Sequence, residues 1–159
     1  MKLTEIVVRD AIVADLKATD RNGVIRELVA ALVSAGALKE TDREAIVRAI
    51  IQRENEGSTG FGKGVAVPHV KHARVGRIMT TIGRCEQGVD FAALDRSPVF
   101  AVVLLLSPQD DPDGHLQAME TIFRHMQREN FRKFLRQSET PEAIAELIQE
   151  ADDLPTDRT

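Results

Sequence analysis

The sequence VFAVVLLL, residues 99–106, is the longest unbroken apolar run in the chain. Eight residues are too few for a membrane helix, which needs about 20. A short run that is apolar at every position is typical of a β-strand with both faces covered. The run therefore predicts a central strand in a sheet that is packed between layers of helices.

Amphipathic segments on both sides of this strand supply those helices. Residues 20–36 carry apolar side chains at helical spacing, with Asp20 as the N-cap. Thr41 and Glu44 form a capping-box pattern, which predicts a second helix that ends near residue 55. Three helical segments follow the apolar strand: one capped by Asp113, one at residues 131–135, and one that opens at Thr140 and Pro141.

Residues 65–67 and 78–83 have the character of short strands, and Pro68 ends the first of them. Helices before, between and after strands are typical of α/β layers. We predict an α/β fold over residues 1–150, a single-domain mixed sheet covered by helices. The acidic residues 151–159 are expected to form a short disordered tail.

The composition excludes several classes of protein. With 21 Lys and Arg against 25 Asp and Glu, the net charge of −4 does not suit a nucleic-acid phosphate backbone, and without Trp or Tyr few aromatic rings are available for base stacking. A single cysteine, Cys85, indicates a reducing compartment. Charges interrupt the first ten residues too early for a signal peptide. We expect a cytoplasmic protein that binds no nucleic acid and does not insert into the membrane.

A glycine-rich loop, GSTGFGKG, follows the second helix at residues 57–64. Gly57, Gly62 and Lys63 match the G-x-x-x-x-G-K pattern of a nucleotide-phosphate loop. The match then fails, because Gly64 replaces the required Ser or Thr, and a helix precedes the loop where a strand should. We therefore interpret these glycines as turn residues that supply positive φ angles.

The histidines offer only a weak case for a metal. His69 and His72 lie three residues apart, and His115 with a nearby Asp could complete a zinc site, but nothing in the spacing fixes that geometry. We predict no metal. His125 lies beside Arg124 and close to Arg128, which favours a solvated surface histidine.

His69 has different surroundings, because it directly follows a strand-ending proline at the sheet edge where ligands bind in open α/β sheets. His115 lies two residues past Asp113, so its ring is expected at a helix N-terminus that favours negative charge. Two neutral imidazoles beside basic residues suit a phosphoryl group. From residue 57 to residue 87 the formal charge is +4, from Lys63, Lys71, Arg74, Arg77 and Arg84 against Glu86.

The stretch RENEGSTGFGKGVAVPH, residues 53–69, closely resembles the active-site signature of the fructose/mannitol-type IIA proteins of the bacterial phosphoenolpyruvate-dependent phosphotransferase system. The resemblance extends over nearly the whole chain. It implies that His69 accepts a phosphoryl group from the phosphocarrier HPr, that His115 orients the phosphate, and that Arg53 offsets its charge. It implies no cofactor.

The loop residues Ser58, Thr59, Gly60 and Gly62 are expected to add backbone or hydroxyl donors to the phosphate site. For Arg53 a second interpretation stays open, in which the guanidinium caps the last carbonyls of its own helix. Val70 departs from the family pattern, which has Gly after the histidine, and Val resists the positive φ that Gly would allow.

The stand-alone pattern looks most like the nitrogen-regulatory branch of the family, whose members act by binding regulated target proteins. The alternative is a sugar-specific IIA protein that passes phosphate to a separate IIB acceptor. A binding module that has kept the fold without phosphorylation is a third reading, because of Val70.

Overall fold

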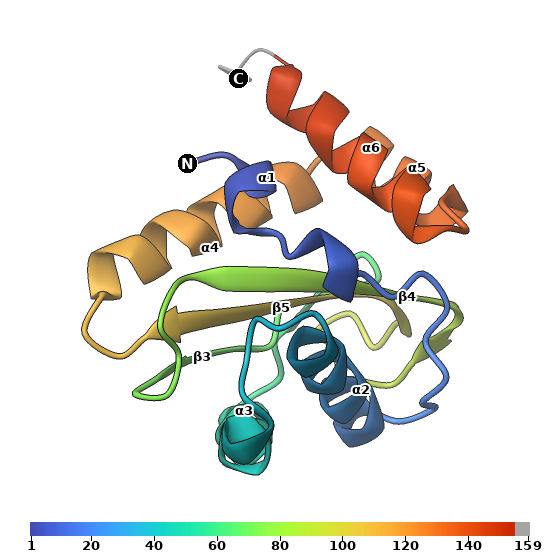
Figure 1. Ribbon diagram of the computed structural model, residues 1–159. Coiled ribbons are helices and arrows are strands. Elements are labelled where there is room, and N and C mark those ends of the chain that lie inside the picture. The colour runs from blue at the N-terminus through green and yellow to red at the C-terminus, as the bar shows by residue number, and fades with distance from the viewer. Residues whose placement is uncertain (155–159) are drawn as a thin grey trace.

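The computed structural model describes residues 1–154 as three layers, with one sheet between two groups of helices (Figure 1). The predicted α/β architecture is confirmed. On one face lie α2 (Arg21–Ser34) and α3 (Arg43–Glu56), and on the other lie α1 (Leu3–Ile6), α4 (Pro112–Met126), α5 (Glu129–Gln137) and α6 (Pro141–Asp153). Two 3₁₀ turns, η1 (Arg9–Ala11) and η2 (Glu40–Asp42), complete the helical elements of the described residues.

The sheet has five strands and β5 lies at its centre, as the apolar run predicts. β4 pairs with β5 antiparallel along one side, and β2 and β3 follow one another parallel to β5 along the other. β1 pairs antiparallel with β2 and extends the sheet outward. The strands are β1 (Gly60–Gly62), β2 (Val65–Ala66), β3 (His69–His72), β4 (Met79–Val89) and β5 (Val99–Pro108).

β5 is buried on both faces because its side chains alternate between the two helical layers. Val102, Leu104 and Leu106 belong to the core that contains α2 and α3. Ala101, Val103 and Leu105 belong to the core that contains α1, α4, α5 and α6. The strand therefore contributes side chains to both halves of the hydrophobic core. Each fully buried Val or Leu side chain contributes roughly 1.5–3 kcal/mol to the free energy of folding.

The edge of the sheet is broken between β2 and β3, at Val67 and Pro68. Pro68 has no N–H to donate, but its carbonyl accepts a bond of 2.9 Å from the N–H of Leu105. His69 therefore begins a strand, β3, whereas the sequence predicts only the end of one. The sequence gives no signal for β3, because three of its four residues are polar and none is fully buried, so they show no apolar pattern.

Two of the expected helix caps form and two do not. Asp20 accepts from the N–H of Gly23 and Thr140 from that of Ala143, as predicted. The capping box at Thr41 and Glu44 is wrong, because a 3₁₀ turn occupies residues 40–42 and α3 begins at Arg43. The cap of α4 is Asp111 rather than Asp113, since Pro112 takes the first helical position and the Asp111 carboxylate reaches Gly114 N–H at 3.0 Å.

The last helix is longer than expected, and residues 151–153 belong to it rather than to a tail. Asp152 is fixed there because its carboxylate accepts the N–H groups of Leu3 and Thr4 at 3.0 and 2.8 Å. The rest of the expected tail, residues 155–159, lies outside the described residues. The surface prediction for His125 is also wrong: its ring is 3% exposed and stacks on Phe131, because α5 and α6 cover the end of α4.

Candidate functional site

The ring of His69 is fixed by its own backbone neighbourhood. Its Nδ1 lies 2.7 Å from the carbonyl oxygen of Val67, two residues earlier in the chain. A carbonyl can only accept, so Nδ1 carries the proton of the neutral ring and Nε2 carries the free lone pair. The break in the sheet edge produces this geometry, because the Val67 carbonyl does not pair with β5 and is free to meet the side chain.

His115 approaches His69 from the first turn of α4. The two ring centroids lie 5.7 Å apart with the planes tilted by 45°. Nδ1 of His115 is 2.7 Å from Oγ of Ser107, a buried residue near the end of β5. Because β3 and α4 both meet the end of β5, the structure brings together the two histidines that the sequence selects.

Both rings are held in their neutral form by their surroundings. Burial lowers the pKa of His69, the positive charge of Arg53 lowers it further, and the Val67 carbonyl and the Glu54 carboxylate oppose these effects. Burial also lowers the pKa of His115, with smaller contributions from His69 and Lys71. Two neutral imidazoles at neutral pH suit a nucleophile and a hydrogen-bonding group.

Arg53 lies in the last turn of α3, as expected, and its Nη1 donates to the carbonyl of Gly57 at 2.9 Å. This bond is the helix-capping arrangement that the sequence left open. It does not remove the guanidinium from the site, because its charge still lowers the pKa of His69. A planar fork with five N–H donors can cap one carbonyl and still offer others to an anion.

The glycine-rich loop uses its polar groups internally. Both the N–H and the hydroxyl of Thr59 donate to the carboxylate of Glu54. Ser58 Oγ donates to the carbonyl of Phe91 and accepts from the N–H of Gly60. Gly62, at φ +105°, lies at the irregular pairing between β1 and β2. In this structure these residues hold the loop together, and the expected donors of Ser58, Thr59 and Gly60 are already occupied.

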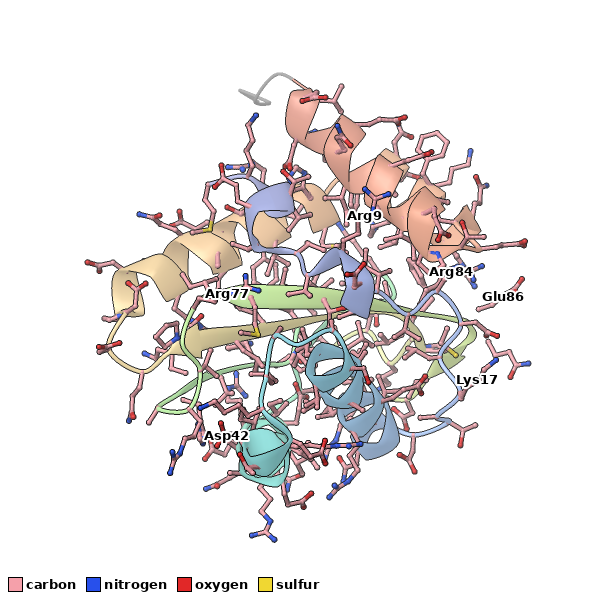
Figure 2. The ribbon with its side chains drawn as sticks, in the orientation of Figure 1. Arg9, Lys17, Asp42, Arg77, Arg84 and Glu86 are labelled. Atoms are coloured by element: carbon pink, nitrogen blue, oxygen red, sulfur yellow. The ribbon has the colours of Figure 1, made fainter. Side chains whose placement is uncertain are left out.

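The basic stretch of the sequence is divided by the fold. Arg84 is buried and donates to the carbonyls of Arg136 and Ala14, and Figure 2 shows it far along the sheet from Arg77. Lys63 borders a hollow at the β1–β2 end of the sheet, with Phe100 and the basic side chains of α5. Among the basic residues of this stretch, Lys71 lies close enough to the histidine pair for its charge to lower the pKa of His115.

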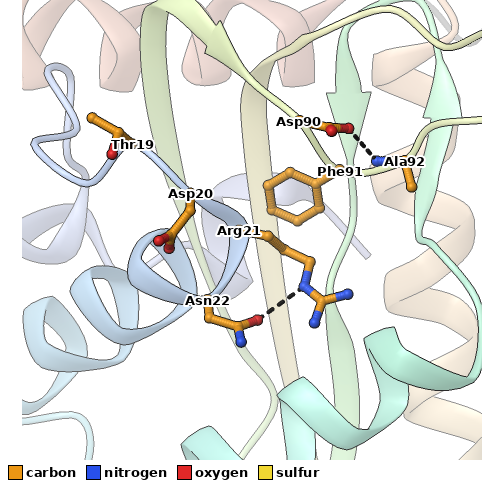
Figure 3. Close-up of a pocket in the computed structure, with 7 residues that line it drawn as sticks. All are labelled: Thr19, Asp20, Arg21, Asn22, Asp90, Phe91 and Ala92. Carbon is orange, nitrogen blue, oxygen red and sulfur yellow. Dashed lines mark hydrogen bonds between the residues drawn. The ribbon is translucent and has the colours of Figure 1, made fainter.

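The other motifs do not build a second site. His72 Nδ1 accepts from the N–H of Arg74, and no three potential ligand side chains gather around a point within residues 1–154. Gly64 has φ +80°, and a Cβ there would lie 2.4 Å from the ring of Phe100, so close packing requires this glycine. A hollow of about 440 Å³ lies around the start of α2. The residues that line it, drawn in Figure 3, include neither histidine of the pair.

Comparison with known proteins identifies the family of this chain. Residues 5–151 match the family described as phosphoenolpyruvate-dependent sugar phosphotransferase system, EIIA 2. The protein belongs to this family. Members of the EIIA 2 family are phosphotransfer proteins, and the resemblance that the sequence predicts is confirmed.

Relatives of this EIIA 2 protein carry two kinds of name. The nitrogen regulatory protein of Bradyrhizobium diazoefficiens is 32% identical over 148 residues, 93% of this chain and 95% of that protein. The fructose-specific EIIABC component of Bacillus subtilis is 35% identical over 152 residues, 96% of this chain. The chain spans only 24% of the length of that Bacillus protein.

Solved structures confirm the fold of this EIIA 2 domain. The nitrogen regulatory protein IIA-Ntr of Neisseria meningitidis superimposes with a TM-score of 0.82 at 26% identity, covering 92% of this chain and 98% of that one. The mannitol IIA protein of Escherichia coli superimposes with a TM-score of 0.73 at 21% identity, covering 87% and 96%. Within residues 1–154, the helices are too short or too polar to cross a membrane.

Three groups that support the histidines are not predicted from the sequence: Ser107 Oγ, the Val67 carbonyl and the carboxylate of Glu54. Ser107 is the residue that ends the apolar run, which is the one signal that could have identified it. Val70 needs no special backbone, because it lies in β3 without a positive φ and pairs with Leu106. The replacement of the family's Gly by Val70 therefore causes no backbone strain.

Proposed function

We propose that the protein is a cytoplasmic phosphoryl carrier that accepts a phosphoryl group from phospho-HPr on Nε2 of His69. The bond between His69 Nδ1 and the Val67 carbonyl carries this proposal. It leaves Nε2 as the nucleophilic atom of a neutral ring, in a site where burial and Arg53 oppose protonation. His115 lies close enough to bond the incoming phosphate, and Arg53 supplies positive charge.

The transfer needs little help from the protein beyond alignment and charge. The lone pair of His69 Nε2 forms a bond to phosphorus while the phosphorus–nitrogen bond of the donor phosphohistidine breaks. The electron pair of that bond returns to the donor ring. The Nδ1 proton of His69 stays in place, shared with the Val67 carbonyl, so the step requires no separate acid or base.

Incubation with phosphoenolpyruvate, enzyme I and HPr tests this function. Intact mass should increase by one phosphoryl group, with an adduct that is stable to alkali and labile to acid. His69→Ala should abolish the increase, whereas the control His72→Ala, three residues along β3, should retain it. Full phosphorylation of the His69→Ala protein would refute the assignment.

We propose that this carrier acts in regulation, by binding target proteins in one phosphorylation state. The full-length match to a nitrogen regulatory protein and the similarity to IIA-Ntr support this reading. The 35% identity to a fructose EIIABC component favours a second candidate, a sugar-specific IIA that passes phosphate to a separate IIB. Neighbouring genes for IIB and IIC components, with phosphate transfer to that IIB, would decide for transport.

A further inference from the structure

The carboxylate of Glu54 is buried in an unusual way. The residue is 3% exposed, at the inner side of the last turn of α3, and no cation pairs with it among the described residues. Glutamate is rarely buried without a paired charge, because taking an ionised carboxylate out of water is costly. A neutral side chain could fill this space with a smaller desolvation free energy. Packing alone therefore does not explain why a carboxylate lies here.

The partners of Glu54 lie in the glycine-rich loop. One carboxylate oxygen accepts the N–H of Thr59 at 3.1 Å, and the other accepts its hydroxyl. These bonds hold the backbone of Thr59 against the end of α3. The carboxylate therefore fixes the loop at one residue, by two bonds at once.

The fixed loop continues directly to the histidine. The carbonyl of Thr59 accepts the N–H of Val67 at 3.2 Å, and the carbonyl of Val67 accepts Nδ1–H of His69 at 2.7 Å. Val67 lies in the break between β2 and β3, where the β5 ladder does not hold it. Its N–H is held by Thr59, which is held in turn by Glu54, while its neighbours Ala66 and Pro68 bond to β5.

We propose that Glu54 is a positioning residue, which sets the tautomer and the orientation of His69 through Thr59 and Val67. Its effect on phosphoryl transfer rests on the proposed function of His69, but its effect on the ring does not. Without the carboxylate, two buried donors of Thr59 lose their acceptor, and the loop must move to satisfy them. The Val67 carbonyl then no longer selects Nδ1 as the protonated nitrogen.

Four variants separate this role from a general loss of stability. Glu54→Ala removes both bonds, whereas Glu54→Gln keeps an acceptor for the Thr59 N–H and offers a donor to its hydroxyl oxygen. Thr59→Val removes only the hydroxyl bond. The matched control is Thr81→Val, which removes a buried hydroxyl bond of 2.6 Å to the Ala11 carbonyl, outside the connection to His69.

The decisive readout is ¹⁵N NMR of the His69 ring in the unphosphorylated protein, which reports which nitrogen carries the proton. We expect the Nδ1–H form in the wild type, in Glu54→Gln and in Thr81→Val, and a mixture with the Nε2–H form in Glu54→Ala and, to a smaller extent, in Thr59→Val. The transfer rate from phospho-HPr should fall tenfold or more, on the order of the cost of misplacing a reacting group, in Glu54→Ala. Glu54→Gln should recover most of that rate.

A wild-type tautomer in both Glu54→Ala and Thr59→Val would overturn the proposal, even if stability or transfer fell. An equal loss of the Nδ1–H form in Thr81→Val would overturn it too. If Glu54→Ala does not fold, Thr59→Val with its control carries the test. A wild-type protein that accepts no phosphate would refute the proposed function, while the tautomer measurement would still decide the role of Glu54.

Discussion

The two histidines of the site are each tied at Nδ1, His69 to the Val67 carbonyl and His115 to Ser107 Oγ. In both rings Nε2 makes no hydrogen bond with a described residue, so it is free for a ligand or reactant. The two bonds use groups that the sheet leaves available, a carbonyl at a strand break and a hydroxyl near a strand end. One backbone carbonyl and one hydroxyl thus occupy Nδ1 of the two rings and leave both Nε2 atoms facing away from these bonds.

Burial is the main cause of the lowered pKa of His69, and Arg53 is expected to add to it, because its positive charge disfavours a second positive charge nearby. Arg53→Gln should raise the pKa of His69 toward the ordinary value of 6.5. An NMR titration of the His69 ring would measure the change, with Arg48→Gln, an exposed arginine of the same helix, as the control. A pKa that stays at the wild-type value would show that the guanidinium is too far away to act.

Arg53→Lys and His115→Ala are each expected to slow phosphoryl transfer to His69 by about 10-fold to 1,000-fold, since one positioned donor contributes on the order of 2–4 kcal/mol to a transition state. Their effects should combine non-additively, because both residues would hold the same phosphoryl group. Single-turnover transfer from phospho-HPr is measured for the two single variants and the double variant, each against the wild type. Wild-type rates in both single variants, at unchanged thermal stability, would exclude these roles.

At the scale of the element, α4 determines where His115 lies. Asp111 caps the helix through Gly114 N–H, and a Cβ on Gly114 would lie 2.4 Å from the Asp111 carboxylate and 2.6 Å from Ile78. A side chain at this position would therefore displace the capping carboxylate and the tip of Ile78. His115 follows that glycine directly, so its position is fixed by the start of the helix.

Asp111→Ala should lower the free energy of unfolding by about 1 kcal/mol, the usual cost of losing an N-cap, and should also slow phosphoryl transfer. Thr140→Ala removes the corresponding cap of α6 and serves as the control. It should cost a similar amount of stability and leave transfer unchanged. Equal transfer rates in the two variants, measured together with urea unfolding, would contradict a positioning role for the start of α4.

At the scale of the whole molecule, the far end of α4 contacts the last helix, which in turn holds the first. His125 Nε2 lies 3.3 Å from Asp152 of α6, and Asp152 in turn holds the first turn of α1. Burial lowers the pKa of His125, although the charge of Asp152 opposes the shift. The contact with Asp152 is the one polar contact of the ring among the described residues, and it falls short of a well-aligned hydrogen bond, so protonation would add a largely desolvated charge inside the core.

Stability should therefore fall as the pH drops from about 7 toward 5. A histidine whose pKa is lowered by folding binds its proton more readily when unfolded, so its contribution is complete above pH 6.5, the ordinary value, and is lost below it. The pKa of His69 and of His115 is also lowered in the folded protein, so these two residues contribute to the pH dependence in the same direction as His125. His125→Gln should flatten the dependence, measured by urea unfolding at several pH values. An unchanged slope would show that His125 does not titrate on unfolding.

Phosphorylation is expected to be read by partners at the surface around His69, without a change of fold. A phosphoryl group adds about −1.5 to −2 charges, which alters complementarity to a partner immediately. Hydrogen exchange of the two forms should differ near β3, the glycine-rich loop and the start of α4, and agree elsewhere. A change in exchange across the central strands would contradict this expectation.

Local patterns in the sequence were sufficient to predict the layered fold, the central strand and the helix caps at Asp20 and Thr140. They were also sufficient to select His69 and His115 as candidate site residues. Periodicity, capping side chains and a family signature are all local, so the sequence displays them directly. The burial of His125 and Arg84, and the length of α6, depended on segments that are distant in the chain. Whether a polar side chain faces water or a carbonyl is decided by what packs against it, and for these residues only the tertiary structure determines that neighbour.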